Sequence, residues 1–166
     1  PITGTGTYDA TGITALAEAL RANGSLTSIS LEDNELDADA AKALAPAIAS
    51  SASLTALDLR GNILGSEGAK ALVDGGAFKG SLTSISLAGN KLDAEAQAVK
   101  ALAPAIASSS SSTHCSLLKN NFDAAAAQRL VEVVKDKDVA LAGRPGVTSD
   151  EEEEDERGVT PPHALT

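Results

Sequence analysis

The sequence contains no methionine and no tryptophan, and only 2% of its 166 residues are aromatic. A hydrophobic core without these large side chains has to be built from Leu, Ile, Val and Ala, each of which buries a modest apolar area. Thin stacked layers suit such side chains better than a globule around one large core. The composition therefore favours a repeat solenoid.

Other absences exclude whole classes of protein. Cys115 is the only cysteine, so an internal disulfide is excluded. No apolar run approaches the roughly 20 residues of a membrane helix, and no signal peptide is visible. No basic stripe is available for a nucleic-acid backbone. We expect an intracellular protein that neither inserts into a membrane nor binds nucleic acid.

The net charge of −10 is concentrated near one end of the sequence. Residues 150–156 are seven consecutive acids, and the residues before them hold 16 acids against 12 Lys and Arg. Such a run repels itself and buries nothing. We therefore predict a flexible acidic tail over residues 148–166, whose simplest role is to increase solubility.

A repeated motif organises the remaining residues. The stretch LTALDLRGNIL, residues 54–64, matches L-x-x-L-x-L-x-x-N-x-L, the signature of a leucine-rich repeat. The pattern returns with Leu26, Ile29, Leu31, Asn34 and Leu36, with Leu82, Ile85, Leu87, Asn90 and Leu92, and more weakly with Ser112, Cys115, Leu117, Asn120 and Phe122. Asn34, Asn62 and Asn90 follow one another at 28 residues, and Asn120 follows after 30.

Each period reads as strand, turn and helix. A short apolar alternation is followed by apolar residues at helical spacing, as in Ala41, Leu44, Ala45 and Ile48. Successive strands of this kind must lie parallel, with the helices outside. Val139 and Leu141 predict a fifth, terminal strand. We expect a degenerate N-terminal repeat or cap over residues 1–23 and repeats over residues 24–147.

Polar residues mark the turns and the helix starts. The repeated asparagines are expected to form a ladder of side-chain amides that satisfies backbone groups after each strand. Asp9, Asp37, Asp93 and Asp123 are predicted helix N-caps, with Ser66 in that role in the second repeat. Pro46 and Pro104 lie inside two helical patterns, where we expect a kink or an interruption on the solvent face.

Repeats of 28 to 30 residues with a full helix resemble the ribonuclease-inhibitor-like branch of the leucine-rich repeat family, over about residues 24–144. The resemblance implies a curved α/β solenoid with an inner parallel sheet and outer helices, which binds proteins on its concave sheet and rarely catalyses. An acidic run after such repeats also looks similar to the Ran GTPase-activating protein. Regulation of a small GTPase is therefore the alternative function, although none of that protein's functional residues can be placed here.

If the leucines point inward, their neighbours line the concave face. Binding interfaces are usually anchored by Trp, Tyr and Arg, and only Arg60 qualifies here. The simplest interpretation is a surface of small, solvated side chains. The alternative is a modest protein-recognition patch formed by Glu32, Asp58, Arg60, His114 and Ser116.

The sequence gives little support for catalytic activity. His114, Ser116 and Asp58 are the residue types of a hydrolytic triad, but His114 and Ser116 would lie about 7 Å apart on one strand. Cys115 is expected to be a buried hydrophobe, and Gly4 to Gly6 lack the context of a phosphate loop. We predict a non-catalytic interaction or scaffold module without metal or cofactor. Because both ends look degenerate, it would suit a larger assembly.

Overall fold

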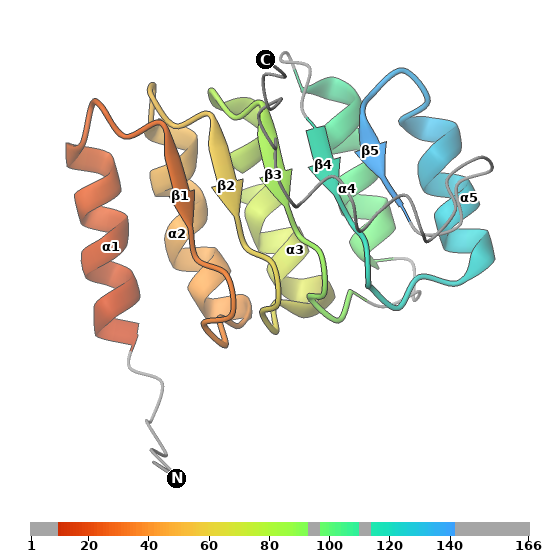
Figure 1. Cartoon of the computed structure of the whole chain (residues 1–166), viewed down its shortest axis with the longest axis horizontal. Helices are drawn as coiled ribbons and strands as arrows, with labels where there is room; N and C mark the ends of the chain where they lie inside the picture. Colours follow the sequence, from red (N-terminus) through yellow and green to blue (C-terminus); the bar gives the residue numbers. More distant parts are fainter. Residues whose placement is uncertain (1–9, 93–96, 110–113, 142–166) are drawn as a thin grey trace, which may run out of the picture.

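The computed structural model describes residues 10–92, 97–109 and 114–141. Within them, helices and short strands alternate along the chain (Figure 1). The helices are α1 (Ala10–Ala22), α2 (Ala38–Ser50), α3 (Gly65–Asp74), α4 (Gln97–Ser108) and α5 (Ala124–Val133), with a 3-10 turn η1 (Ala77–Lys79) after α3. The strands are β1 (Ser28–Ser30), β2 (Ala56–Asp58), β3 (Ser84–Ser86), β4 (His114–Ser116) and β5 (Val139–Ala140).

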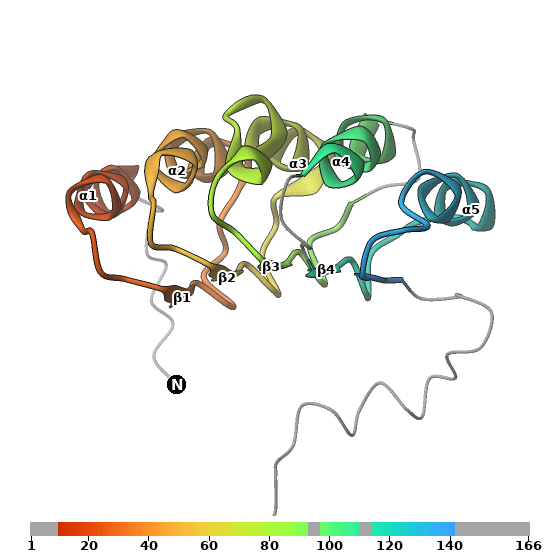
Figure 2. The same ribbon diagram turned by 90° about the horizontal axis from the view of Figure 1, so that it is seen from above.

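All five strands form one parallel sheet in sequence order, as the strand–turn–helix period requires. The second apolar position of each repeat is in register, so Ile29, Leu57, Ile85, Cys115 and Val139 form one row across the sheet. The helices cover one face only and are spread more widely than the strands, which lie on the inside of the arc (Figure 2). The expected leucine-rich solenoid and its fifth strand are therefore confirmed.

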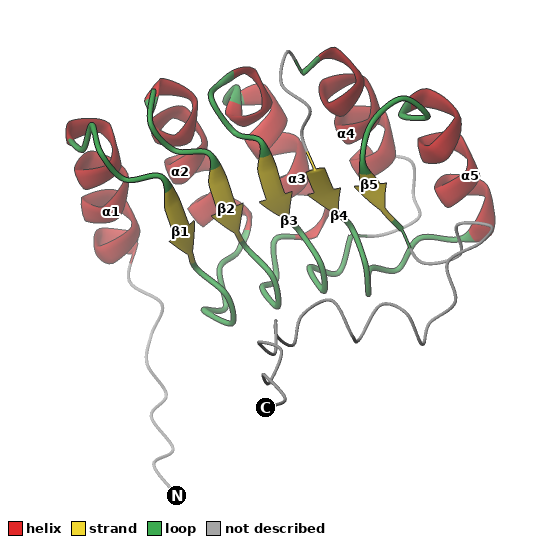
Figure 3. Cartoon of the chain, turned by 45° about the horizontal axis from the view of Figure 1, so that its top comes forward, coloured by secondary structure: helices red, strands yellow, loops and turns green. Residues whose placement is uncertain are grey.

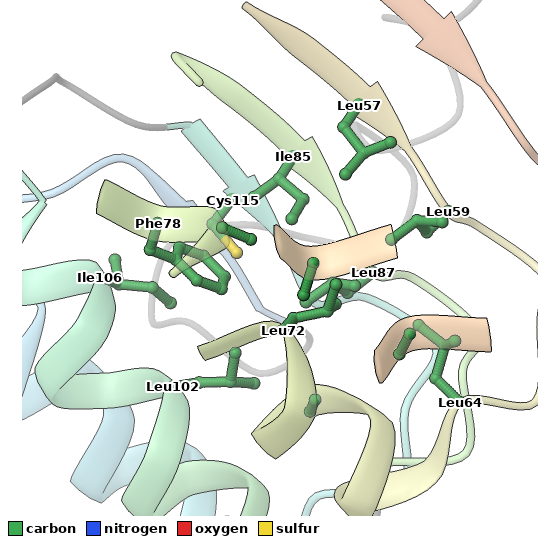
Figure 4. Packing of buried hydrophobic residues seen from close by; sticks show 14 of the residues in the cluster. Leu57, Leu59, Leu64, Leu72, Phe78, Ile85, Leu87, Leu102, Ile106 and Cys115 are labelled. Atoms are coloured by element: carbon green, nitrogen blue, oxygen red, sulfur yellow. The ribbon is translucent and has the colours of Figure 1, made fainter. Parts of the chain in front are cut away.

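The core lies between the sheet and the helix layer. Leu57 and Ile85 from the sheet and Leu72 and Leu102 from the helices are at most 2% exposed (Figure 4). The expectation of an entirely aliphatic core needs one correction. The second repeat has Gly76 where the first has Ile48, and η1 brings the ring of Phe78 into the core at 5% exposure.

The asparagine ladder is confirmed by its hydrogen bonds. The side-chain oxygen of Asn62 accepts from the backbone N–H of Asn34 at 3.0 Å and of Leu36 at 2.9 Å. Its side-chain nitrogen donates to the carbonyl of Leu31 at 2.9 Å and of Leu59 at 2.8 Å. Asn90 and Asn120 repeat this arrangement one and two repeats later. The ladder joins each repeat to the one before it.

The loops after the strands lead into the helices along one side of the sheet (Figure 3). Asp37 caps α2 by accepting hydrogen bonds from two backbone N–H groups, and Asp123 caps α5 through Ala126. The prediction for Ser66 is wrong. Gly65, at a left-handed φ of 58°, starts α3 two residues after Ile63, so Leu64 holds the cap position in place of Ser66, and the Leu64 side chain makes no capping hydrogen bond.

The two interior prolines do not interrupt their helices. Helix α2 runs through Pro46 and α4 through Pro104, and both prolines are exposed, as expected for the solvent face. In α2 the flanking Ala45, Ala47 and Ile48 are at most 1% exposed. Burial of this inner face holds the helix together where the proline removes one hydrogen bond on the outer face.

Several sequence-based expectations lie outside the described residues. These are the acidic tail over residues 148–166, Gly4 to Gly6, the caps Asp9 and Asp93, and Ser112. The division of the chain at residues 23 and 147 also stays a prediction.

Candidate functional site

Side chains of the sheet alternate between the helix layer and the concave face. In β2, β3 and β4 the central residue is buried, and its two neighbours are half-buried or exposed. The strands therefore contribute Ser28, Ser30, Ala56, Asp58, Ser84, Ser86, His114, Ser116 and Ala140 to the concave face. Most of these side chains are small, so the middle of this face is a flat, weakly polar floor.

Three of the predicted site residues meet at the N-terminal half of this face. The Nε atom of Arg60 lies 2.8 Å from Oε1 of Glu32, and its Nη2 atom donates to Oε2 of the same carboxylate at 2.9 Å. Asp58 Oδ2 lies 3.6 Å from Nη2, and Asp58 Oδ1 accepts from the backbone N–H of Arg60 at 2.9 Å. We call Glu32, Asp58 and Arg60 the arginine cluster.

The arginine cluster holds one guanidinium between two carboxylates. The hydrogen bond from Arg60 lowers the pKa of Glu32 below its ordinary value of 4.5, because it stabilises the charged carboxylate. The side chains of Arg60 and Glu32 are 32% and 37% exposed, so the pair is open to solvent along one side. Arg60 is thus a positioned guanidinium whose charge is already compensated, and the cluster as a whole is negative.

His114 lies in a second, separate pair. Its Nδ1 atom is 2.7 Å from Oδ2 of Asp138, and both side chains are exposed. Asp138 is not among the residues of the predicted recognition patch. The signal was present, because Cys115 and Val139 occupy equivalent positions and the residues before them must therefore be neighbours.

Ser116 lies on β4, two residues after His114, and belongs to neither charged group. It is half-buried, with Ser86 on one side and Ala140 on the other in strand register. Asp58 is in register with Ser86, so one full strand separates it from Ser116, a distance of roughly 9 Å. Asp58, His114 and Ser116 therefore do not form a hydrolytic triad.

Residues 10–92, 97–109 and 114–141 also show no arrangement that supports metal binding, membrane insertion or thiol chemistry. In that part of the chain no three His, Cys, Asp or Glu side chains lie close enough to hold a metal ion. No helix there is long and apolar enough to cross a membrane. Cys115 is fully buried, and burial raises the pKa of its thiol to about 12. It packs as a small hydrophobe, which confirms its inward placement.

Hollows in the surface lie on the helix side of the solenoid. One of about 390 Å³ is lined by Val73 and Phe78 on one side and by Pro104 and Ala105 on the other. Another, of about 330 Å³, lies between α2 and α3, where Lys70 and Asp74 form an ion pair. Neither of these two hollows includes a residue of the arginine cluster or the His114–Asp138 pair.

Comparison with known proteins agrees with this geometry. The family model described as Leucine Rich repeat matches residues 22–45 and 50–73, each of which contains one strand, its turn and the first turns of the next helix. A search of curated protein sequences finds no match.

Two solved structures are similar to this chain. Leiomodin-1 Actin-Binding Site 2 aligns with 81% of this chain and 76% of its own, at a TM-score of 0.59 and 17% identity. The Caenorhabditis elegans tropomodulin C-terminal domain aligns with 74% of this chain and 91% of its own, at a TM-score of 0.43 and 13% identity. At 17% identity the first likeness supports the fold alone. Because the matched repeats and the stacked strands define the same repeating unit, this chain has the fold of a leucine-rich repeat solenoid.

Proposed function

We propose that this chain is a non-catalytic protein-interaction module whose concave sheet receives a protein partner. The observation that carries the proposal is the arrangement of charge on that sheet. Ser84 and Ser86 of β3 lie between the arginine cluster on one side and the His114–Asp138 pair on the other, with Ser116 on the same strand as His114. A flat floor with hydrogen-bonding groups fixed at both ends suits an extended protein surface better than a small molecule.

The arginine cluster would set orientation and partner choice. Its two carboxylates hold the guanidinium in one position, so a partner meets a preorganised group and loses little additional side-chain entropy on binding. The excess of carboxylate favours a partner that brings a positive charge. Glu32, Asp58, Arg60, His114 and Ser116 remain the proposed binding residues, and Asp138 joins them through its contact with His114.

The test compares two matched double variants of the full chain. Asp58→Ala with Arg60→Ala removes charges of both signs from the concave face, whereas Lys70→Ala with Asp74→Ala does the same on the helix side. Proteins recovered by immobilised wild type are quantified by mass spectrometry, and those that bind are purified and titrated. We expect affinity to fall at least about tenfold with the concave variant only, a loss of about 1.4 kcal/mol. Equal recovery with all three proteins would contradict the proposal.

Two named probes extend this test. Actin is one, because the similar leiomodin structure is that of an actin-binding site. A panel of small GTPases is the other, since regulation of such a GTPase is the alternative suggested by the acidic run. Faster GTP turnover on addition of this chain would replace the scaffold proposal with the regulatory one.

A further inference from the structure

The N-terminal end of the solenoid lacks, among the described residues, the neighbour that every later repeat has. Leu26, Ile29 and Leu31 are half-buried, whereas the equivalent Leu54, Leu57 and Leu59 of the next repeat are at most 2% exposed. The first repeat is less buried because no described repeat lies before it to cover these side chains. This end therefore exposes part of its core.

The backbone of β1 also lacks a neighbouring strand on one side, among the described residues. Leu31 and Asp33 donate backbone hydrogen bonds toward the second repeat. Alternate residues of a parallel strand bond to opposite sides, so the N–H and C=O groups of Ser28 and Ser30 face away from β2. No described strand pairs with them. An edge of this kind is a template for another parallel strand.

The asparagine ladder also stops here. The side-chain oxygen of Asn62 accepts hydrogen bonds from two backbone N–H groups of the repeat before it, at 3.0 and 2.9 Å. The side chain of Asn34 keeps only the contact inside its own turn, where its nitrogen donates to the carbonyl of Glu32 at 2.7 Å, and Asn34 is exposed. No described group donates to its side-chain oxygen. A strand and turn added before β1 would supply the missing donors.

Helix α1 has no described helix on the flank where α3 meets α2. On α3, a Cβ at Gly68 would lie 2.8 Å from the Cβ of Leu64, and in ordinary contact with Ala38 and Ala41 of α2 at 3.4 and 3.6 Å. The equivalent residue of α1, two repeats earlier, is Gly12, which is exposed and would meet nothing within 4 Å. Glycine weakens a helix interior. At Gly68 the Cβ of Leu64 excludes a side chain, and α2 fills the space beside it at ordinary contact distance; at Gly12 no described residue fills the corresponding space.

The other end of the chain offers that helix. Asp37 and Asp123 cap α2 and α5 in the same way, which aligns the two helices residue by residue. Ala38, Ala41 and Ala45 of α2 then correspond to Ala124, Ala127 and Val131 of α5. Ala127 and Val131 are half-buried, whereas Ala41 and Ala45 are at most 1% exposed under α3. The outer flank of α5 thus repeats the apolar surface that α2 presents to α3.

We propose that the α1–β1 end of one copy binds the α5–β5 end of a second copy, head to tail, with Gly12 packed over Ala124 and Ala127. The contact continues the interface that already joins neighbouring repeats. It is heterologous, so each copy keeps one free end and longer chains can grow. This proposal does not depend on the concave face, and either one can fail alone.

Two substitutions block the two ends separately in the full chain. Gly12→Gln places a long side chain where Ala124 and Ala127 would pack, and Ala127→Gln does so from the opposite side. Gln is a better helix former than Gly, so the first variant is expected to fold at least as well as the wild type. Glu18→Gln is the matched control, because the equivalent Pro46 and Asp74 stay exposed with neighbouring helices on both sides.

Sedimentation equilibrium between about 1 μM and about 500 μM covers the usual range of weak self-association. Salt near 0.15 M screens the repulsion between like-charged copies. We expect the average mass of wild type and Glu18→Gln to rise with concentration beyond a dimer, while each blocked variant stays at 16.6 kDa. An equimolar mixture of the two blocked variants should form dimers and stop, because one good end remains on each.

Each other outcome contradicts the proposal. Wild type that remains at 16.6 kDa throughout would show that nothing of this kind forms. Association of Ala127→Gln alone would indicate a contact between two N-terminal ends. A mixture that stays monomeric, or a loss of association in Glu18→Gln, would also overturn it. Circular dichroism on each variant separates loss of association from loss of folding.

Discussion

Gly75 at the end of α3 lies against Ala45 of α2 so closely that a Cβ on Gly75 would overlap the Cβ of Ala45. The backbone of Gly75 has an ordinary helical φ of −73°, so the position needs glycine for space and not for conformation. Gly75 lets the end of α3 approach α2 more closely than a side chain there would permit. The absence of a side chain at Gly75 therefore sets the distance between α2 and α3, the outer helices of the first two repeats.

Gly75→Ala is expected to destabilise the protein by about 1–3 kcal/mol, the usual effect of forcing extra volume into a packed contact. Urea unfolding followed by circular dichroism measures the loss. Gly24→Ala is the control, because a Cβ at Gly24 would meet nothing within 4 Å. Equal midpoints for the two variants would show that α2 and α3 separate at no cost.

Asn62→Ala should be more harmful than its small change in volume suggests. Asn62 is 1% exposed, and its removal leaves the N–H groups of Asn34 and Leu36 and the carbonyls of Leu31 and Leu59 without this partner. Each buried group left unsatisfied costs about 1–3 kcal/mol. We expect a loss of about 3 kcal/mol or more in the free energy of unfolding.

Asn34→Ala tests the same residue type at the end of the ladder. Asn34 is exposed and donates one side-chain hydrogen bond within its own turn. Because water can replace that bond, the expected loss is below about 1 kcal/mol. A similar loss in both variants would mean that the ladder contributes through local turn geometry and not through contacts between repeats.

The period of the asparagines was enough to predict the sheet, because equal spacing along the chain becomes strand register once each helix returns to the same side. Asn34 and Asn62 predicted the alignment of Ser28 with Ala56 in this way. The same reasoning places Glu32 beside Arg60, a contact that the sequence analysis did not draw. Local exceptions were harder to foresee. Neither the left-handed Gly65 nor the ring of Phe78 in the core follows from spacing.

The pairing of charged side chains on the concave face also depended on the spacing between neighbouring repeats, which is not constant. His114 and Asp138 are only 24 residues apart, against 28 for Glu32 and Arg60. A fixed period therefore assigns His114 no partner, whereas aligning Cys115 with Val139 does. Physical reasoning from the sequence predicted the faces of the strands well, but pairings on those faces need the register of each repeat separately.

Cys115 should be unreactive while the protein is folded. Burial raises the pKa of its thiol to about 12, so near pH 8 only about one molecule in ten thousand carries the thiolate that reacts. Labelling with a thiol reagent should therefore follow unfolding and speed up across the urea transition. Rapid labelling of the native protein at pH 8 would indicate that β4 opens without global unfolding.

Arg60→Gln should raise the pKa of Glu32 toward 4.5, because the hydrogen bond from the guanidinium is the largest cause of its depression. A carboxyl group whose pKa is lower in the folded state stabilises the fold above its ordinary pKa, and loses that contribution as the pH falls through the folded value. The wild type should therefore lose more stability than Arg60→Gln as the pH drops below 4.5. Carbon NMR of the Glu32 carboxyl measures the midpoint directly, with Lys70→Gln on the far layer as the control. The same Glu32 midpoint in all three proteins would show that Arg60 does not hold this carboxylate in solution, and the arginine cluster would then lose its fixed geometry as a binding surface.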